Sequence, residues 1–177
     1  FFDFYKKYLI YPEAKPNAAH YYLAALEKTG KLKAVVTQNI DSLHEMAGSQ
    51  KVFKLHGSVD RNYCLGCHRF YDLTAFLALE GPVPHCLDCG KVVKPDVTLY
   101  EESLDMDVFS QSAQAIRQAD LLIIGGTSLV VYPAASLVNY FSGTNLVLIN
   151  KTSIPQDSQA TLVIEGKIGE VFSKLRQ

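Results

Sequence analysis

Two C-x-x-C pairs are the feature that most constrains this chain. Cys64 and Cys67 form the first pair, Cys86 and Cys89 form the second, and eighteen residues separate them. This spacing suits two turns that close a tetrahedral zinc site, and four thiolates leave no open position on the metal. We therefore expect a structural zinc ion with these four cysteines as its ligands.

A pair of redox dithiols is the other explanation for the cysteines. It would favour an exposed C-x-x-C in an electropositive setting, and nothing in the sequence favours that. His68 and His85 each neighbour a cysteine and could replace a ligand, but four cysteines already suffice. A secreted disulfide protein would more often spread its cysteines across the fold, so we expect a reducing compartment, the cytoplasm.

Charge and hydropathy exclude several classes of protein. The 177 residues are 48% hydrophobic and 20% charged, which excludes a disordered chain. Seventeen basic and eighteen acidic side chains give a formal charge of -1, so no global field attracts nucleic acid or anionic lipid. The longest aliphatic run, residues 121–124, is far shorter than the roughly 20 residues that span a bilayer. We expect neither a nucleic-acid partner nor a membrane.

Hydrophobic periodicity predicts alternating strands and helices. Helices are expected over residues 17–29, with Asn17 as N-cap and Gly30 as the stop, 103–119 with Ser103 as N-cap, 133–141 and 168–175. Strands are expected over residues 32–38, 120–124, 145–149 and 161–164. This alternation predicts an α/β fold, a Rossmann-like parallel sheet with helices on both faces.

The alternation stops where the cysteines lie. Residues 62–96 have few apolar periods, so we expect an inserted zinc-ribbon module of irregular backbone, held by metal rather than by a core. Residues 1–61 and 97–177 then form the Rossmann-like domain, and residues 1–16 could belong to a helical small-domain module.

Polar clusters follow three of the predicted strands, at residues 37–41, 125–128 and 150–151. The carboxyl edge of an open parallel sheet is where ligands bind, so the clusters together favour a nucleotide-sized ligand. A polar residue after a strand is by itself more often only a turn. No G-x-G-x-x-G and no Walker-type loop occurs, so the phosphates would be held differently or by residues upstream.

Three further features have both a structural and a functional explanation. His56 lies in an apolar-flanked stretch, where a histidine is more often structural, but beside a cleft it could act as a base near neutral pH. His44 has the same ambiguity. The acidic run at residues 101–107 is explained by the start of a helix, and it could also attract a cationic peptide.

Taken together, the motifs resemble the sirtuins, the NAD-dependent protein lysine deacylases. Those that carry the resemblance are, in order, Pro16-Asn17-Ala18-Ala19-His20, Thr37-Gln38-Asn39-Ile40-Asp41-Ser42-Leu43-His44, Leu55-His56-Gly57, the paired C-x-x-C, Lys94-Pro95-Asp96-Val97 and Gly126-Thr127-Ser128-Leu129. They cover essentially the whole chain.

The resemblance implies NAD as cofactor and an acyl-lysine protein or peptide as substrate. His56 would be the general base, with Asn39 also catalytic. The segment Val97, Thr98 and Leu99 would bind the peptide as an added strand, through backbone. The NAD-binding residues implied are Gln38, Asn39, Ile40, Asp41, Gly126, Thr127, Ser128, Asn150, Lys151 and Ile168. The products would be nicotinamide, O-acyl-ADP-ribose and deacylated lysine.

Two departures from the sirtuin pattern stand out. Thr98 and Tyr100-Glu101-Glu102 occupy the place of a second valine and a Phe-Gly-Glu, which we expect to alter acyl or peptide preference more than activity. The family's Gly-Ala-Gly loop is not in these residues, and we expect the natural protein to have it. If these 177 residues were the whole molecule, we would expect weak NAD binding and little turnover.

Other functions remain open at this point. A sirtuin-like ADP-ribosyltransferase would use the same pocket, although His56 and Asn39 favour deacylation. An inactive fragment or a non-enzymatic zinc-ribbon binding module is the second alternative. A nucleic-acid-binding ribbon would need exposed Lys and Arg around the cysteines, and acidic residues outnumber basic ones over residues 62–96.

Overall fold

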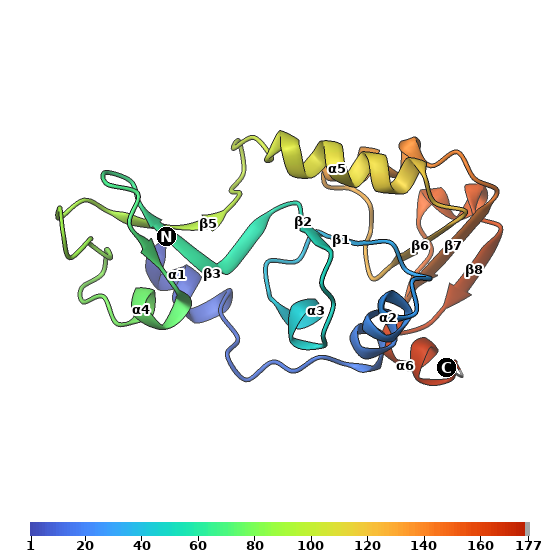
Figure 1. Cartoon of the computed structure of the whole chain (residues 1–177), viewed down its shortest axis with the longest axis horizontal. Helices are drawn as coiled ribbons and strands as arrows, with labels where there is room; N and C mark the ends of the chain where they lie inside the picture. The colour runs from blue at the N-terminus through green and yellow to red at the C-terminus, as the bar shows by residue number, and fades with distance from the viewer. Residues whose placement is uncertain (176–177) are drawn as a thin grey trace. The chain divides into compact units, whose positions relative to one another are not determined.

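The computed structural model describes residues 1–175; residues 176 and 177, the end of the predicted Rossmann-like domain, lie outside the described part. The chain forms two compact units (Figure 1). The first unit contains residues 1–14, 39–42 and 56–103, and the second contains residues 15–38, 43–55 and those from 104 onward. The predicted zinc module falls entirely within the first unit, and the predicted division into two domains stays a prediction.

Each unit has its own set of elements. The first contains helices α1 (Phe2–Tyr8) and α4 (Leu73–Leu77) and strands β3 (Gly57–Cys64), β4 (Phe70–Tyr71) and β5 (Val93–Val97). The second contains helices α2 (Ala18–Lys28), α3 (Leu43–Met46), α5 (Met106–Arg117) and α6 (Ile168–Ser173), the 3₁₀ helices η1 (Ala134–Tyr140) and η2 (Pro155–Gln159), and strands β1 (Val35–Thr37), β2 (Val52–Lys54), β6 (Leu121–Gly125), β7 (Asn145–Asn150) and β8 (Leu162–Glu165).

The second unit confirms the predicted α/β class. Strands β6, β7 and β8 form one parallel sheet in that order, and β1 pairs in parallel with β2. Neighbouring residues of β7 face opposite layers: Leu148 packs in a cluster with Ala135 of η1, whereas Ile149 packs with Ala19 of α2 and Phe172 of α6. Because side chains alternate along a strand, the sheet is covered on both faces.

Local signals set several helix ends. Asn17 caps α2 through a capping box: its side chain accepts from Ala19 N at 2.9 Å, and Nδ1 of His20 accepts from Asn17 N. Gly30 follows α2 with φ of 74°, as a helix stop requires. The predicted N-cap of α5 is wrong, because Asp105, not Ser103, accepts from the first helical amides.

The first unit corrects the prediction of an irregular zinc module without a core. Its strands form an antiparallel sheet in the order β4-β3-β5. Tyr5 and Phe76 are fully buried in its hydrophobic cluster with Val93 and the cysteines Cys64 and Cys86. This core could not be recognised from the sequence, because its residues come from α1, α4 and single positions of the strands. They follow no common hydrophobic periodicity.

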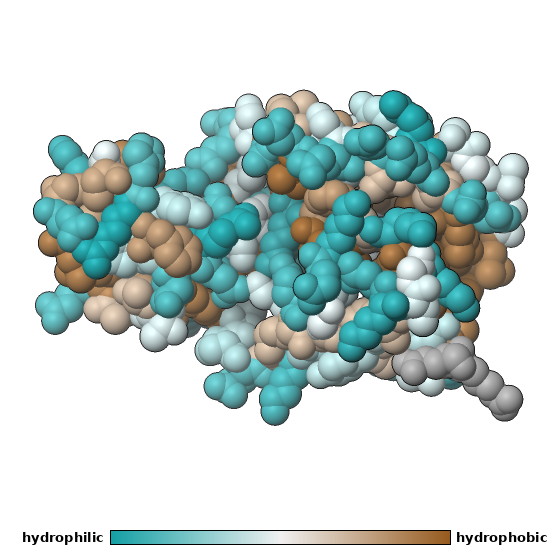
Figure 2. Space-filling view, in the orientation of Figure 1, coloured by the Kyte–Doolittle hydropathy of each residue, from teal (hydrophilic) through white to brown (hydrophobic). Residues whose placement is uncertain are grey.

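Figure 2 shows a largely hydrophilic face on which hydrophobic side chains gather in a few places. The exposed hydrophobic side chains include Leu162 and Val163 on β8, and Leu65, Phe70 and Leu87 near the cysteines in the sequence. Within residues 1–175, no helix has the length and apolar character needed to cross a bilayer.

Candidate active site and metal centre

The four cysteines form one cluster, as predicted. Their sulfur atoms all lie within 4.8 Å of one another, with Sγ–Sγ distances of 3.3 Å for Cys64 and Cys89 and 3.6 Å for Cys67 and Cys86. A tetrahedral zinc ion with Zn–S bonds of about 2.3 Å places its sulfurs about 3.8 Å apart. Only a small adjustment would therefore admit zinc, and the closed set of thiolates makes its role structural.

Backbone amides support the first cysteine turn. The amides of Gly66 and Cys67 donate to Cys64 Sγ at 3.3 and 3.4 Å, which favours the thiolate form. A Cβ at Gly66 would lie 2.6 Å from Lys91 Cγ and 3.3 Å from Cys89 Sγ, so this glycine is required by space rather than by its φ angle. Gly90, in contrast, has a φ of 68°, which a turn after the second pair requires.

Tyr71 of β4, and Arg69 just before β4, contact the second cysteine turn. The buried hydroxyl of Tyr71 donates to Cys86 Sγ at 3.2 Å and accepts from Leu87 N at 2.9 Å. Arg69 forms an ion pair with Asp88 and lies over the Tyr71 ring. The hydrogen bond from Tyr71 is the main reason that the pKa of the Cys86 thiol is lowered to about 6. Tyr71 is thus an outer-sphere partner of the metal site.

Removing the Tyr71 hydroxyl is expected to loosen zinc. In Tyr71→Phe the pKa of Cys86 rises, so protons compete better for the sulfur and acid releases zinc at a higher pH than in the wild type. Transfer of zinc to a colorimetric chelator at pH 7 is expected to be roughly tenfold faster. Tyr63→Phe is the control, because Tyr63 packs on Phe70 and is partly exposed. Equal release from the wild type and both variants would contradict this role.

The polar clusters predicted at residues 37–41, 125–128 and 150–151 begin at the ends of three parallel strands of the second unit. Thr37 ends β1, Gly125 ends β6 and Asn150 ends β7. The Asn150 side chain forms two hydrogen bonds with the backbone of Thr127: its Oδ1 accepts from Thr127 N at 3.1 Å, and its Nδ2 donates to Thr127 O at 2.9 Å. Asn150 therefore fixes the loop after β6, a role that the sequence did not indicate.

The loop after β6 has the features of a phosphate-side loop. Gly126 has a φ of 67°, and a Cβ built there would meet nothing within 4 Å, so the loop faces open space. Thr127 Oγ1 accepts from Leu129 N at 3.1 Å, and Ser128 is exposed. Ile168, at the start of α6, covers Gly125 so closely that a Cβ there would lie 2.4 Å from Ile168 Cδ1.

The other predicted site residues lie in the first unit. Asn39, Ile40 and Asp41 form an irregular segment, and Ile40 O accepts from Val59 N of β3 at 3.0 Å. His56 directly precedes β3, and its carbonyl accepts from Thr98 N at 3.0 Å. The predicted site residues are thus divided between the two units. The members in the second unit are Gln38, residues 126–128, Asn150, Lys151 and Ile168.

The predicted peptide-binding segment lies at a sheet edge. Val97 ends β5, which pairs with β3 on one side, and no other strand within residues 1–175 pairs with its free side. Lys94 Nζ donates to Val97 O at 3.1 Å and to Glu102 Oε2 at 3.0 Å, and the same carboxylate accepts from Leu99 N at 2.9 Å. These bonds hold the segment that follows β5, and a peptide added at this edge would have to replace them at Val97 O and Leu99 N.

The backbone of Glu101 is in the left-handed region, with a φ of 72°, and its side chain is exposed. A non-glycine residue in this region is strained, so Glu101→Gly is expected to raise the free energy of unfolding by about 1 kcal/mol in urea titrations. Glu102→Gly is the matched control and is expected to lower it, because it removes the acceptor for Leu99 N and Lys94. A less stable Glu101→Gly protein would refute this explanation.

Comparisons with known proteins bear on the family and the fold of the chain. A family model described as "Sir2 family" matches residues 1–133. The chain is 63% identical over 176 residues to a Clostridium perfringens protein named NAD-dependent protein deacetylase, covering 99% of this chain and 72% of that protein.

The chain belongs to the Sir2 family. A Cutibacterium acnes member, also named NAD-dependent protein deacetylase, is 50% identical over 177 residues, which cover 100% of this chain and 72% of that protein. A solved Sir2 structure with p53 peptide and NAD+ has a TM-score of 0.92 and 39% identity, covering 98% of this chain and 75% of that one. Another, bound to a propionylated peptide, has the same TM-score and identity and covers 98% and 76%.

Proposed function

We propose that this sirtuin is an NAD-dependent protein lysine deacylase of the deacetylase type. The observation that carries the proposal is the 63% identity, over 99% of the chain, to a protein named NAD-dependent protein deacetylase. The matching Sir2 structures with NAD+, acetylated peptide and propionylated peptide support NAD and an acyl-lysine peptide as its two substrates.

The residues have distinct roles in this proposal. Gln38, the segment Asn39–Asp41, the loop 126–128, Asn150, Lys151 and Ile168 bind NAD, and Val97–Leu99 pair with the peptide backbone. The acyl oxygen of the substrate lysine attacks the anomeric carbon of the ribose, and nicotinamide leaves. The imidazole of His56 accepts the proton of a ribose hydroxyl, whose oxygen then attacks the acyl carbon. Asn39 helps to orient the reacting groups.

Within unit one, the described contacts support the roles of His56 and the peptide edge. Because His56 O accepts from Thr98 N, the residue that bears the base and the residue after Val97 are joined by one hydrogen bond. The cysteine cluster would hold zinc as a brace for the β3-β4-β5 sheet, apart from the chemistry. A site of four zinc-bound thiolates suits a reducing compartment, and we place the protein in the cytoplasm.

A mass-spectrometric assay tests the reaction. The protein, expressed from its natural reading frame, is incubated with NAD and an acetyl-lysine peptide. We expect nicotinamide, deacetylated peptide and O-acetyl-ADP-ribose in equal amounts. ADP-ribosylated protein without O-acetyl-ADP-ribose would contradict the proposal and identify an ADP-ribosyltransferase instead.

A further inference from the structure

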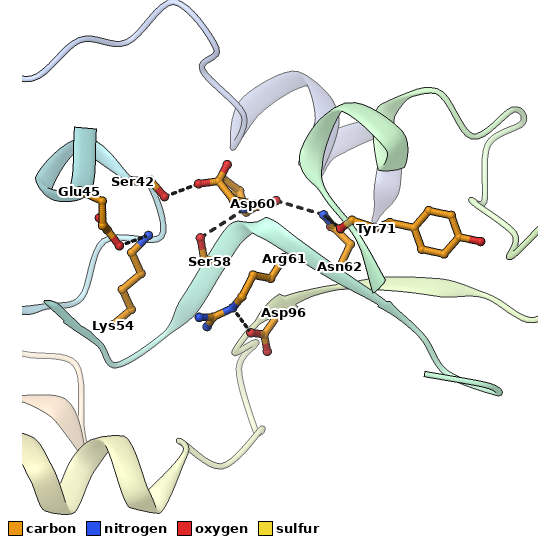
Figure 3. A network of polar contacts seen from close by, with 10 residues as sticks. Ser42, Glu45, Lys54, Ser58, Asp60, Arg61, Asn62, Tyr71 and Asp96 are labelled. Atoms are coloured by element: carbon orange, nitrogen blue, oxygen red, sulfur yellow. Dashed lines mark hydrogen bonds and ion pairs between the residues drawn. The ribbon is translucent and has the colours of Figure 1, made fainter. Parts of the chain in front are cut away.

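The segment Asn39–Ser42 has to be held in place by contacts with other elements, because it contains no helix or strand. Two hydrogen bonds attach it to consecutive residues of β3. Val59 N donates to Ile40 O at 3.0 Å, and Ser42 Oγ donates to the carboxylate of Asp60 (Figure 3). The first bond is made by backbone and is independent of side-chain identity. The second depends on a hydroxyl at position 42 and an acceptor at position 60.

Hydrogen bonds within the first unit hold the strand around Asp60. The amide of Asp60 donates to the hydroxyl of Ser58, which is 2% exposed, and the register of β3 with β5 shifts between Ser58 and Asn62. The fully buried Asn62 side chain donates to Val59 O and to Tyr71 O, both at 3.2 Å. The irregular part of β3 is therefore held by hydrogen bonds on both sides of Asp60.

The charge of this carboxylate also acts on Tyr5 of helix α1. Tyr5 of α1 is fully buried, and burial first, with the charge of Asp60 second, raises the pKa of its hydroxyl. Val59, which precedes Asp60 on β3, is buried in the hydrophobic cluster of the first unit, while the Asp60 carboxylate bonds to Ser42. The neighbouring residue Arg61 differs: it is exposed and forms an ion pair with Asp96 of β5, at 2.8 Å.

We infer that Asp60 is a positioning residue for NAD, which acts by holding Ser42 and hence the segment Asn39–Asp41 in its binding conformation. This inference rests on the proposed function, in which that segment binds NAD. A loop that is already ordered loses less conformational entropy when its ligand binds, so the Ser42–Asp60 bond raises affinity without touching the ligand. A hydrogen bond to a charged acceptor is strong enough for its loss to be measured.

A double-mutant cycle tests the pair. Ser42→Ala and Asp60→Ala are each expected to raise the KM for NAD roughly tenfold, with the KM for the acetyl-lysine peptide and kcat changed less than about twofold. The double variant is expected to resemble the single variants, because each removes the same bond. Ser42→Thr keeps the hydroxyl and should restore the wild-type KM. Arg61→Ala, on the same strand, is the control and should leave the KM for NAD unchanged.

Hydrogen exchange separates this inference from the proposed function. In ligand-free protein, Ser42→Ala should speed amide exchange of residues 39–42 roughly tenfold, while Arg61→Ala should not. If exchange responds in this way but the wild-type protein does not turn over NAD, the Ser42–Asp60 bond does order the segment. In that case only the proposed function fails. If the wild type deacetylates its peptide while neither exchange nor the KM for NAD responds to Ser42→Ala, the positioning role is overturned. Should Asp60→Ala not fold, Ser42→Ala alone gives the same two readings.

Discussion

His56→Ala is expected to lower kcat for deacetylation by about 10²- to 10⁴-fold, the usual contribution of a general base. NAD affinity should change less than about threefold, because the proposed role of the imidazole is proton transfer rather than binding. The measurement is a steady-state assay of O-acetyl-ADP-ribose together with a direct titration of NAD.

His68→Asn is the control for this substitution. His68 is an exposed histidine in the left-handed region, with a φ of 59°, and asparagine is tolerated there. It should keep wild-type kcat. A His56→Ala protein with more than about a tenth of the wild-type kcat would contradict the role of His56 as the base.

Cys86→Ser is expected to lose stoichiometric zinc and to destabilise the protein by more than about 4 kcal/mol, a change that loss of a structural metal can produce. Cys86 and Cys64 are 4% and 0% exposed within the core of the first unit, so an incomplete site leaves thiols buried without their metal. The midpoint of thermal unfolding should fall by roughly 10 °C. Metal analysis and calorimetry measure the two effects.

His85→Ala is the matched control for the zinc site. His85 precedes Cys86, and its Nδ1 lies 2.9 Å from Gly90 O, outside the cysteine cluster. This variant should keep one zinc ion. If Cys86→Ser kept its zinc and its stability, or if His85→Ala lost zinc, the ligand set of four cysteines would be wrong.

The fold class and most elements of the second unit could be predicted, because the spacing of their apolar residues is typical of helices and strands. The aliphatic run of β6 and Asn17 as the N-cap of α2 are local signals, and both were confirmed. The sheet of the first unit could not be predicted in this way. Strand β3 contains three polar residues in succession, Asp60, Arg61 and Asn62, and its register with β5 shifts between Ser58 and Asn62. The sequence of β3 therefore lacks the alternation of apolar and polar residues by which a strand is recognised.

In the candidate site, too, local signals could be predicted and long-range contacts could not. Sequence motifs named its residues, but not the contacts that position them. Asn150 and Thr127 are 23 residues apart, Ser42 and Asp60 are 18 apart, and Tyr71 and Cys86 are 15 apart. Tyr71 had one available signal, a tyrosine four residues after the first cysteine pair. No short-range pattern reveals the other two contacts, because each joins a turn to a different strand.

A crystal structure of the protein with NAD and an acetyl-lysine peptide tests the central claim most directly. The account predicts that a ring nitrogen of His56 lies about 2.6–3.2 Å from a ribose hydroxyl. Asn39 and Ser128 should contact the same dinucleotide, and the peptide should pair with Val97. A dinucleotide bound elsewhere, with its ribose beyond the reach of His56, would contradict the account.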